Sequence, residues 1–252
     1  MRTLAITALI ICLAIVAEAQ SPSISRPSGP NSPSSQRLPR AVIPFNSFNF
    51  GDVYTGDLIS QIFVIKNMGD ADLQITDFKG ECGCTVVHSE KVIPPGQEGI
   101  AEIEVQTASQ SGAISKPAMM HTNDPNQPTI MFTLVANVLK GAPLRQGKYI
   151  GPIFLSPDSR GGMFSMPGKK TTAEFSITAD QAPVKVLRAE VETKNFITRV
   201  VELEAGRSYK IQVESMPIQK GGVYMDRIRI VTDHPELPPF NIPLALRVYE
   251  VQ

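Results

Sequence analysis

The feature that most constrains this chain is an alternation of apolar and polar residues that begins near residue 43 and recurs to the C-terminus. In Ala101-Glu102-Ile103-Glu104-Val105 the apolar side chains point one way and the glutamates the other. The same period of two recurs in Phe132 to Val138, Tyr209 to Val213, Arg227 to Ile230 and Ile242 to Val248. Successive side chains of a β-strand point to opposite faces, so this period predicts half-buried strands. No stretch has a convincing helical period. Many short strands about ten residues apart are typical of antiparallel β-sandwiches, and we expect an all-β fold.

A repeated turn sequence predicts two domains. Thr122-Asn123-Asp124-Pro125 precedes an apolar strand that ends at Val138, and Thr232-Asp233-His234-Pro235 precedes another that ends at Val248. Asn and Asp before Pro favour turns, and this explains His234 better than acid–base chemistry does. We therefore predict two tandem sandwiches, over residues 43–140 and 144–252. Residues 156–170, which are rich in Gly and Pro, are expected to form a long loop.

The N-terminus has the pattern of a secretory signal peptide. A short positive start is followed by an apolar run from Leu4 to Ala17, and Ala17-Glu18-Ala19 fits a signal-peptidase site. We predict a signal peptide over residues 1–19 and no transmembrane segment in the mature chain. The protein is expected to be exported, to the periplasm or outside the cell. An uncleaved anchor is the alternative.

Residues 20–42 are rich in Ser and Pro and carry Arg26, Arg37 and Arg40 without any acid. This composition cannot bury a core, so it predicts a disordered linker. A contact of the three arginines with an anionic surface is the alternative.

The charge balance and the lack of common catalytic motifs argue against two classes of function, nucleic-acid binding and catalysis. The formal net charge is zero and no long run of charge occurs, so we do not expect a nucleic-acid partner. The sequence has no Gly-x-Ser-x-Gly elbow, His-Glu-x-x-His, P-loop or Gly-x-Gly-x-x-Gly. We expect a non-enzymatic binding or scaffold protein of the cell envelope, whose partner is another envelope protein. A hydrolase site assembled from scattered acids is the catalytic alternative.

The first predicted domain resembles the bacterial domain-of-unknown-function family 1573, over about residues 43–140. The resemblance rests on Phe50-Gly51-Asp52-Val53, Gly56, Phe63-x-Ile65-Lys66-Asn67, Gly69, Leu73, Cys82-Gly83-Cys84-Thr85, Ile93-Pro94-Pro95-Gly96, Gly99 and Thr122-Asn123-Asp124-Pro125. That family is related to the ASH and major-sperm-protein-like sandwiches. The resemblance therefore implies immunoglobulin-like β-sandwiches and a place in the cell envelope. It implies no activity.

Cys82 and Cys84 are the only cysteines after the signal peptide. On a regular strand residues i and i+2 lie about 6.6 Å apart on one face, near the upper limit for a disulfide. Three interpretations stay open: small packing side chains that are either reduced or oxidised, a labile disulfide with a redox role, and a thiolate pair for Cu(I). The candidate metal ligands are Cys82 and Cys84, with His88 as a further candidate. No other cofactor is expected. Met119, Met120 and His121 are further candidate ligands for a soft metal. They end a predicted strand, where alternate side chains pack in the core, and packing explains them better.

Overall fold

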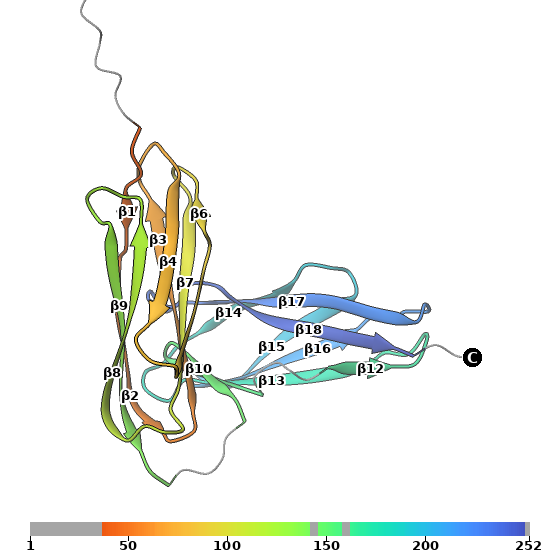
Figure 1. Cartoon of the computed structure of the whole chain (residues 1–252). Helices are drawn as coiled ribbons and strands as arrows, with labels where there is room; N and C mark the ends of the chain where they lie inside the picture. Colours follow the sequence, from red (N-terminus) through yellow and green to blue (C-terminus); the bar gives the residue numbers. More distant parts are fainter. Residues whose placement is uncertain (1–36, 142–145, 158–161, 250–252) are drawn as a thin grey trace, which may run out of the picture. The chain divides into compact units, whose positions relative to one another are not determined.

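The structure is a computed structural model that describes residues 37–141, 146–157 and 162–249. These residues form β-strands and contain no helix, so the predicted all-β class is confirmed (Figure 1). The predicted signal peptide and residues 20–36 of the predicted linker lie outside them. No helix that could cross a membrane occurs in the described ranges.

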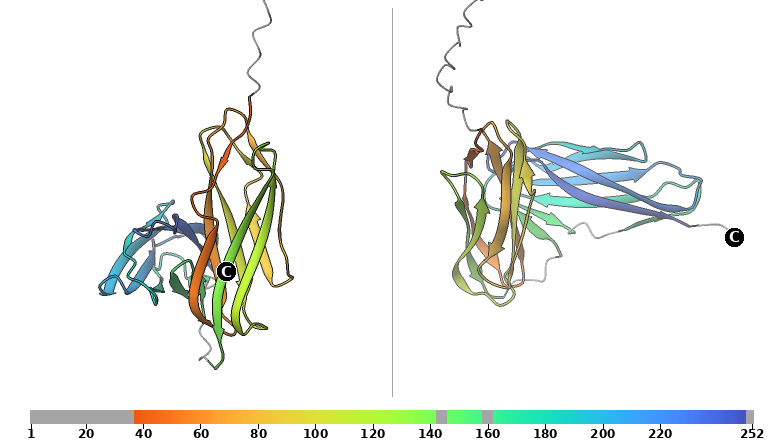
Figure 2. Two further views of the ribbon diagram at one scale, coloured as in Figure 1. Left: turned by 90° about the vertical axis from the view of Figure 1, so that its left-hand side faces the viewer. Right: turned by 45° about the horizontal axis from the view of Figure 1, so that its top comes forward.

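The first sandwich consists of two facing sheets. Its strands are β1 (Ala41–Val42), β2 (Ser47–Tyr54), β3 (Leu58–Asn67), β4 (Leu73–Gly80), β5 (Thr85–Ser89), β6 (Val92–Ile93), β7 (Glu98–Gln106), β8 (Gly112–Thr122) and β9 (Thr129–Leu139). One sheet has the order β2-β9-β8-β4-β6, and the other contains β1, β3, β7 and β5. The two layers can be followed in both views of Figure 2.

The second sandwich follows the same plan. Its strands are β10 (Lys148–Ile150), β11 (Ile153–Ser156), β12 (Met163–Ser165), β13 (Thr172–Thr178), β14 (Val186–Val191), β15 (Phe196–Glu204), β16 (Ser208–Ser215), β17 (Gly222–Thr232) and β18 (Phe240–Val248). One sheet has the order β12-β18-β17-β14, and β15, β16, β13, β11 and β10 form the other layer. The prediction of one long loop over residues 156–170 is wrong at residues 163–165. These residues form β12, which pairs with β18 and buries Met163 and Ser165.

One sheet runs through both sandwiches. Strand β10 pairs with β11 and also runs parallel to β3, with Lys148 opposite Leu58 and Ile150 opposite Ser60. Tyr149 consequently packs in the first hydrophobic core, and Ile62 of β3 packs in the second. The sequence alternation does not reveal this exchange.

The two cores confirm the alternation. Ala101, Ile103 and Val105 of β7 are fully buried, and so are Ile211 and Val213 of β16. Phe63 packs against Phe132 with ring centroids 5.0 Å apart. Burying such a side chain stabilises the fold by about 1.5–3 kcal/mol.

The sheets are antiparallel, as predicted, apart from three parallel pairs: β2 with β9, β3 with β10 and β12 with β18. Two of these pairs have one cause. An early strand of each sandwich lies beside the last strand of the same sandwich and runs in the same direction.

The predicted linker extends too far. Residues 38–42 belong to the first sandwich, since β1 pairs with β3 and the Ala41 N–H donates to Asp124 Oδ2 at 2.7 Å. Gly69 permits this close approach, because a Cβ atom there would lie 2.3 Å from the Leu38 carbonyl oxygen. A two-residue strand is too short to show an alternation, which is why composition alone misplaced the boundary.

The two repeated turns share side-chain hydrogen bonds. Asn123 Oδ1 accepts the Gln74 N–H at 2.8 Å, and Asp233 Oδ1 accepts the Lys185 N–H at 2.8 Å. His234 Nδ1 accepts the Glu236 N–H at 3.3 Å, as Asp124 Oδ1 accepts that of Asn126. The expected turn role of His234 is therefore confirmed.

Candidate functional site

The Cys-Gly-Cys motif lies in the turn between β4 and β5. Cys82 and Cys84 form a disulfide whose Cα atoms are 5.3 Å apart. The Thr85 N–H donates to the Cys82 carbonyl oxygen at 3.1 Å and closes the turn. The chain bends at Gly83 and is not an extended strand here, which brings the Cα atoms closer than regular strand spacing would.

Thr85, the last residue of the motif, contacts the disulfide directly. Its Oγ1 lies 3.2 Å from Cys82 Sγ. A Cβ atom on Gly80 would lie 2.5 Å from Thr85 Cγ2, so only glycine leaves room for the threonine. Both cysteines are partly exposed, and Cys84 also packs against the first core.

The other predicted metal ligands are not gathered around the disulfide. His88 lies on β5 opposite Glu102 of β7, Met120 is fully buried in the first core, and His121 Nδ1 contacts Thr129 Oγ1. Within the described part of the chain, no group of three or more His, Cys, Asp and Glu side chains is arranged to hold a metal ion. In this disulfide form neither sulfur is a thiolate, so the Cu(I) prediction concerns the reduced protein.

A second site lies along one edge of β3. The other edge pairs with β7 in continuous register from Leu58 to Lys66. On the edge of interest, β10 covers residues 58–60 and β1 covers residues 66 and 67. Among the described residues, no strand pairs with residues 61–65 on this edge.

The direction of the backbone groups follows from the hydrogen bonds on either side of the gap. The Ser60 carbonyl accepts the Gly151 N–H, and the Met68 N–H donates to the Arg40 carbonyl, so even-numbered residues of β3 point toward this edge. Asn67 points the other way, because its N–H donates to Gln97 at the start of β7. The N–H and C=O of Val64 therefore face the gap.

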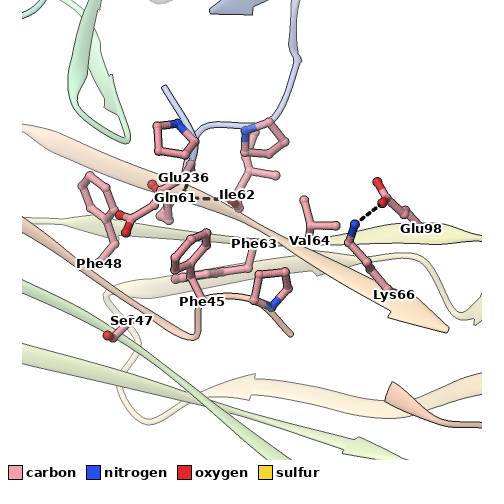
Figure 3. A pocket seen from close by; sticks show the side chains of 13 residues that line it. Phe45, Ser47, Phe48, Gln61, Ile62, Phe63, Val64, Lys66, Glu98 and Glu236 are labelled. Atoms are coloured by element: carbon pink, nitrogen blue, oxygen red, sulfur yellow. Dashed lines mark hydrogen bonds and ion pairs between the residues drawn. The ribbon is translucent and has the colours of Figure 1, made fainter. Parts of the chain in front are cut away.

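This gap forms the floor of a pocket of about 160 Å³. Its walls are aromatic residues and prolines: Pro44, Phe45, Phe48, Phe63, Pro235 and Pro238. Figure 3 shows Phe45 beside Phe63, with Val64 and the ion pair of Lys66 and Glu98 further along the strand. The Lys66 Nζ to Glu98 Oε1 distance is 2.7 Å.

Gln61 is the buried polar residue of this pocket. Its Nε2 donates to the carbonyls of Glu236, at 2.7 Å, and Ile62, at 3.0 Å (Figure 3). Its Oε1 is buried and has no hydrogen-bond partner in the described structure. Two carbonyls fix the orientation of the amide, since a flipped amide would direct an oxygen at both of them.

The first sandwich can now be compared with known families. Residues 43–138 match the family described as "Protein of unknown function (DUF1573)". The resemblance in the sequence is therefore confirmed for this part of the chain. The DUF1573 match covers the Cys-Gly-Cys-Thr turn and all of β3, so both candidate sites involve the matched domain.

The solved structures that resemble this chain are distant. A protein of unknown function from Porphyromonas gingivalis is 13% identical, with 82% of this chain and 99% of that chain covered and a TM-score of 0.32. The N-terminal Ig1-2 module of the Drosophila receptor protein tyrosine phosphatase DLAR is 12% identical, with 83% and 99% covered and a TM-score of 0.38. The ASH/PapD-like domain of human CEP192 is 11% identical, with 51% and 99% covered and a TM-score of 0.33. None of these likenesses carries an argument about function. No curated protein matches this chain.

The sequence singles out the Cys-Gly-Cys motif without settling whether the cysteines are bonded, and it does not predict the pocket. Gln61 carried a usable signal, because it is a polar residue inside the apolar run from Leu58 to Ile65. Glu236 carried none, since it contributes a backbone carbonyl from a distant turn.

Proposed function

We propose that this chain is an exported protein of the bacterial envelope that binds another envelope protein without catalysing a reaction. The observation that carries the proposal is the unpaired stretch of β3 at the floor of the aromatic pocket. Unpaired strand edges recruit extended segments of other proteins through main-chain hydrogen bonds. The signal-peptide pattern of residues 1–19 and the zero net charge support export and a protein partner.

The chemistry of the pocket favours binding over catalysis. Its charged groups include Lys66 and Glu98, which pair with each other, and its buried polar group is an amide. No nucleophile hydrogen-bonded to a base lines it among the described residues. Aromatic and proline walls around a few polar groups are typical of a recognition site.

Crosslinking in intact cells tests the proposal. The tagged full-length protein is expressed in the bacterium that naturally carries it. The intact cells are then treated with a membrane-impermeable amine-reactive crosslinker. We expect one predominant crosslinked envelope protein, which disappears when residues 1–19 are deleted and export fails. Recovery of the tagged protein only in the cytoplasm, or no crosslinked protein above background, would contradict the proposal.

The disulfide turn supports a second candidate, thiol–disulfide exchange. The specific observation is the Thr85 hydroxyl beside Cys82 Sγ, because a hydroxyl donor stabilises a thiolate on the sulfur it contacts. In such an exchange a partner dithiol reduces the Cys82–Cys84 bond and is itself oxidised to a disulfide, with two electrons and two protons transferred. Cu(I) binding by the reduced pair stands beside this candidate.

A titration separates these thiol functions. The reduced mature protein and its Cys82→Ser/Cys84→Ser variant are compared for Cu(I) binding by competition with a chromophoric chelator. The oxidised mature protein is titrated separately with a small dithiol to measure how readily its disulfide is reduced. Stoichiometric Cu(I) binding that the variant loses would favour metal binding. Ready reduction without Cu(I) binding would favour exchange. If the disulfide resists reduction and no Cu(I) binds, both functions are excluded.

A further inference from the structure

We infer that the unpaired stretch of β3 binds a short extended segment of a partner protein, which is added to the sheet between β1 and β10. This inference rests on the proposed binding function and specifies its site, its partner chemistry and its geometry.

The length of the gap sets the length of the segment. Residues 61–65 span about 16 Å at strand spacing, enough for a segment of about five residues. Strands β1 and β10 already pair with the same edge on either side, so a segment in the gap continues an existing row of strands. The N–H and C=O of Val64 are among the groups that it would pair with.

Gln61 limits the gap at its β10 end. Its Nε2 donates to the Ile62 carbonyl, which faces this edge, and to the Glu236 carbonyl. The backbone groups of β3 that are left for a bound segment are therefore the N–H of Ile62 and the N–H and C=O of Val64. An extended peptide segment carries a backbone donor at every residue except proline, and an acceptor at every residue.

The walls determine the side chains of the segment. Phe45 is 44% exposed at the rim of the pocket. Together with Pro44 and Pro238 it forms an apolar surface that fits an apolar side chain of the bound segment. The Lys66–Glu98 pair at the other end fits a polar side chain.

The gap favours a segment over the folded edge of a second copy. The edge strands β5 and β15 of a second copy are each paired with a neighbouring strand of eight or nine residues, which is longer than the gap, so neither enters the space between β1 and β10 by itself. A short flexible segment has no such restriction. The bound chain is therefore an extended segment, with an apolar side chain and no proline opposite Val64.

The probe is a displayed library of random linear dodecapeptides, selected on the full mature chain. Selected peptides are synthesised with a fluorophore, and their Kd values are measured by fluorescence anisotropy for the wild type, Val64→Pro and Val64→Ile. Proline at this position removes an N–H that faces the gap and not one that bonds to β7, so the β3–β7 ladder is kept. Isoleucine is the matched control, because it keeps that N–H.

We expect Val64→Pro to weaken binding about tenfold or more, and Val64→Ile to change it less than about twofold. In a series of peptides N-methylated at one amide each, we expect every second position to lose binding, because alternate N–H groups face β3. This series needs no protein variant, so it decides the question even if Val64→Pro does not fold.

Four results would overturn the inference. One is equal binding by wild type and Val64→Pro together with no alternation in the methylation series. Another is markedly tighter peptide binding by a chain that starts at residue 37, which would assign the gap to the preceding residues of the chain itself. The third is a dimer in sedimentation that Val64→Pro abolishes, which would assign the gap to a second copy. The fourth is partner crosslinking that persists in Val64→Pro, which would leave the proposed function standing.

Discussion

At the scale of single residues, Asn67 shows how one buried side chain holds several segments together. Its Nδ2 donates to the carbonyls of Ala71 and Ile93, both at 2.8 Å. Its Oδ1 accepts the N–H groups of Gly69, at 3.0 Å, and Arg40, at 3.3 Å. The residue is fully buried, so no water replaces these bonds.

Asn67→Ala is expected to lower the free energy of unfolding by about 3 kcal/mol, because buried carbonyl and N–H groups lose their partners. The control is Asn137→Ala, which removes an exposed asparagine on β9 whose Nδ2 donates to Asp52 Oδ1. We expect the control to change stability by less than about 1 kcal/mol. Urea denaturation measures both variants, and equal losses would contradict the role assigned to Asn67.

Glu202 predicts a pH dependence of stability. The Gly206 N–H, and then the Tyr209 hydroxyl, donate to its carboxylate and hold its pKa below the ordinary 4.5. Burial, and then the bond to Glu202, raise the pKa of Tyr209 above 10.0. A carboxyl whose pKa is lower in the folded state stabilises the fold above its unfolded pKa. That stability is lost as pH falls through the folded pKa.

Between about pH 5 and about pH 3, the Tm of the wild type is therefore expected to fall more than that of Glu202→Gln, which has no charge to lose at this position. Thermal unfolding at a series of pH values measures the difference. Parallel falls of both proteins would show that these hydrogen bonds do not contribute.

The sequence predicts the residues whose role depends on burial alone. The alternation from Ala101 to Val105 predicts a buried face, and Ala101, Ile103 and Val105 are buried. The role of Gln61 depends on the Glu236 carbonyl, which is brought to it from far along the chain. The contact of Thr85 with the disulfide depends on a turn closed by backbone bonds. The alternation of apolar and polar residues carries no information on either of these two contacts.

At the scale of elements, the repeated turn was recognised in the sequence because its residues act locally. Asn123 and Asp233 each close a turn and bond to the backbone of a neighbouring strand or its flank. Strand β1 was not recognised, because two residues carry no period.

Asn123→Ala removes the bonds to Gln74 and Asp72 and is expected to destabilise the protein by about 2 kcal/mol. Asp233→Ala removes the bond to Lys185 and is expected to cost about 1 kcal/mol, the usual contribution of one hydrogen bond. Asp233→Asn keeps the accepting oxygen and serves as the control. Chemical denaturation of the three variants tests the equivalence. A loss for only one of the two alanine variants would show that the turns are not equivalent.

At the scale of the whole molecule, the shared sheet links the fold to the proposed function. Strand β1, from the N-terminal side, and β10, from the second half of the chain, meet the same edge of β3 and leave residues 61–65 between them. The sequence predicts two sandwiches from its repeated turn. It does not predict this gap, because the pairing of β10 with β3 joins residues far apart in the sequence.

The most direct test of the account is amide hydrogen exchange of the full chain along β3, resolved by residue. Phe63 and Ile65 direct their N–H groups at β7, whereas Val64 directs its N–H at the gap. The account predicts slow exchange at Phe63 and Ile65 and fast exchange at Val64. Protection of Val64 equal to that of its two neighbours would show that this edge is already covered, and would contradict the central claim.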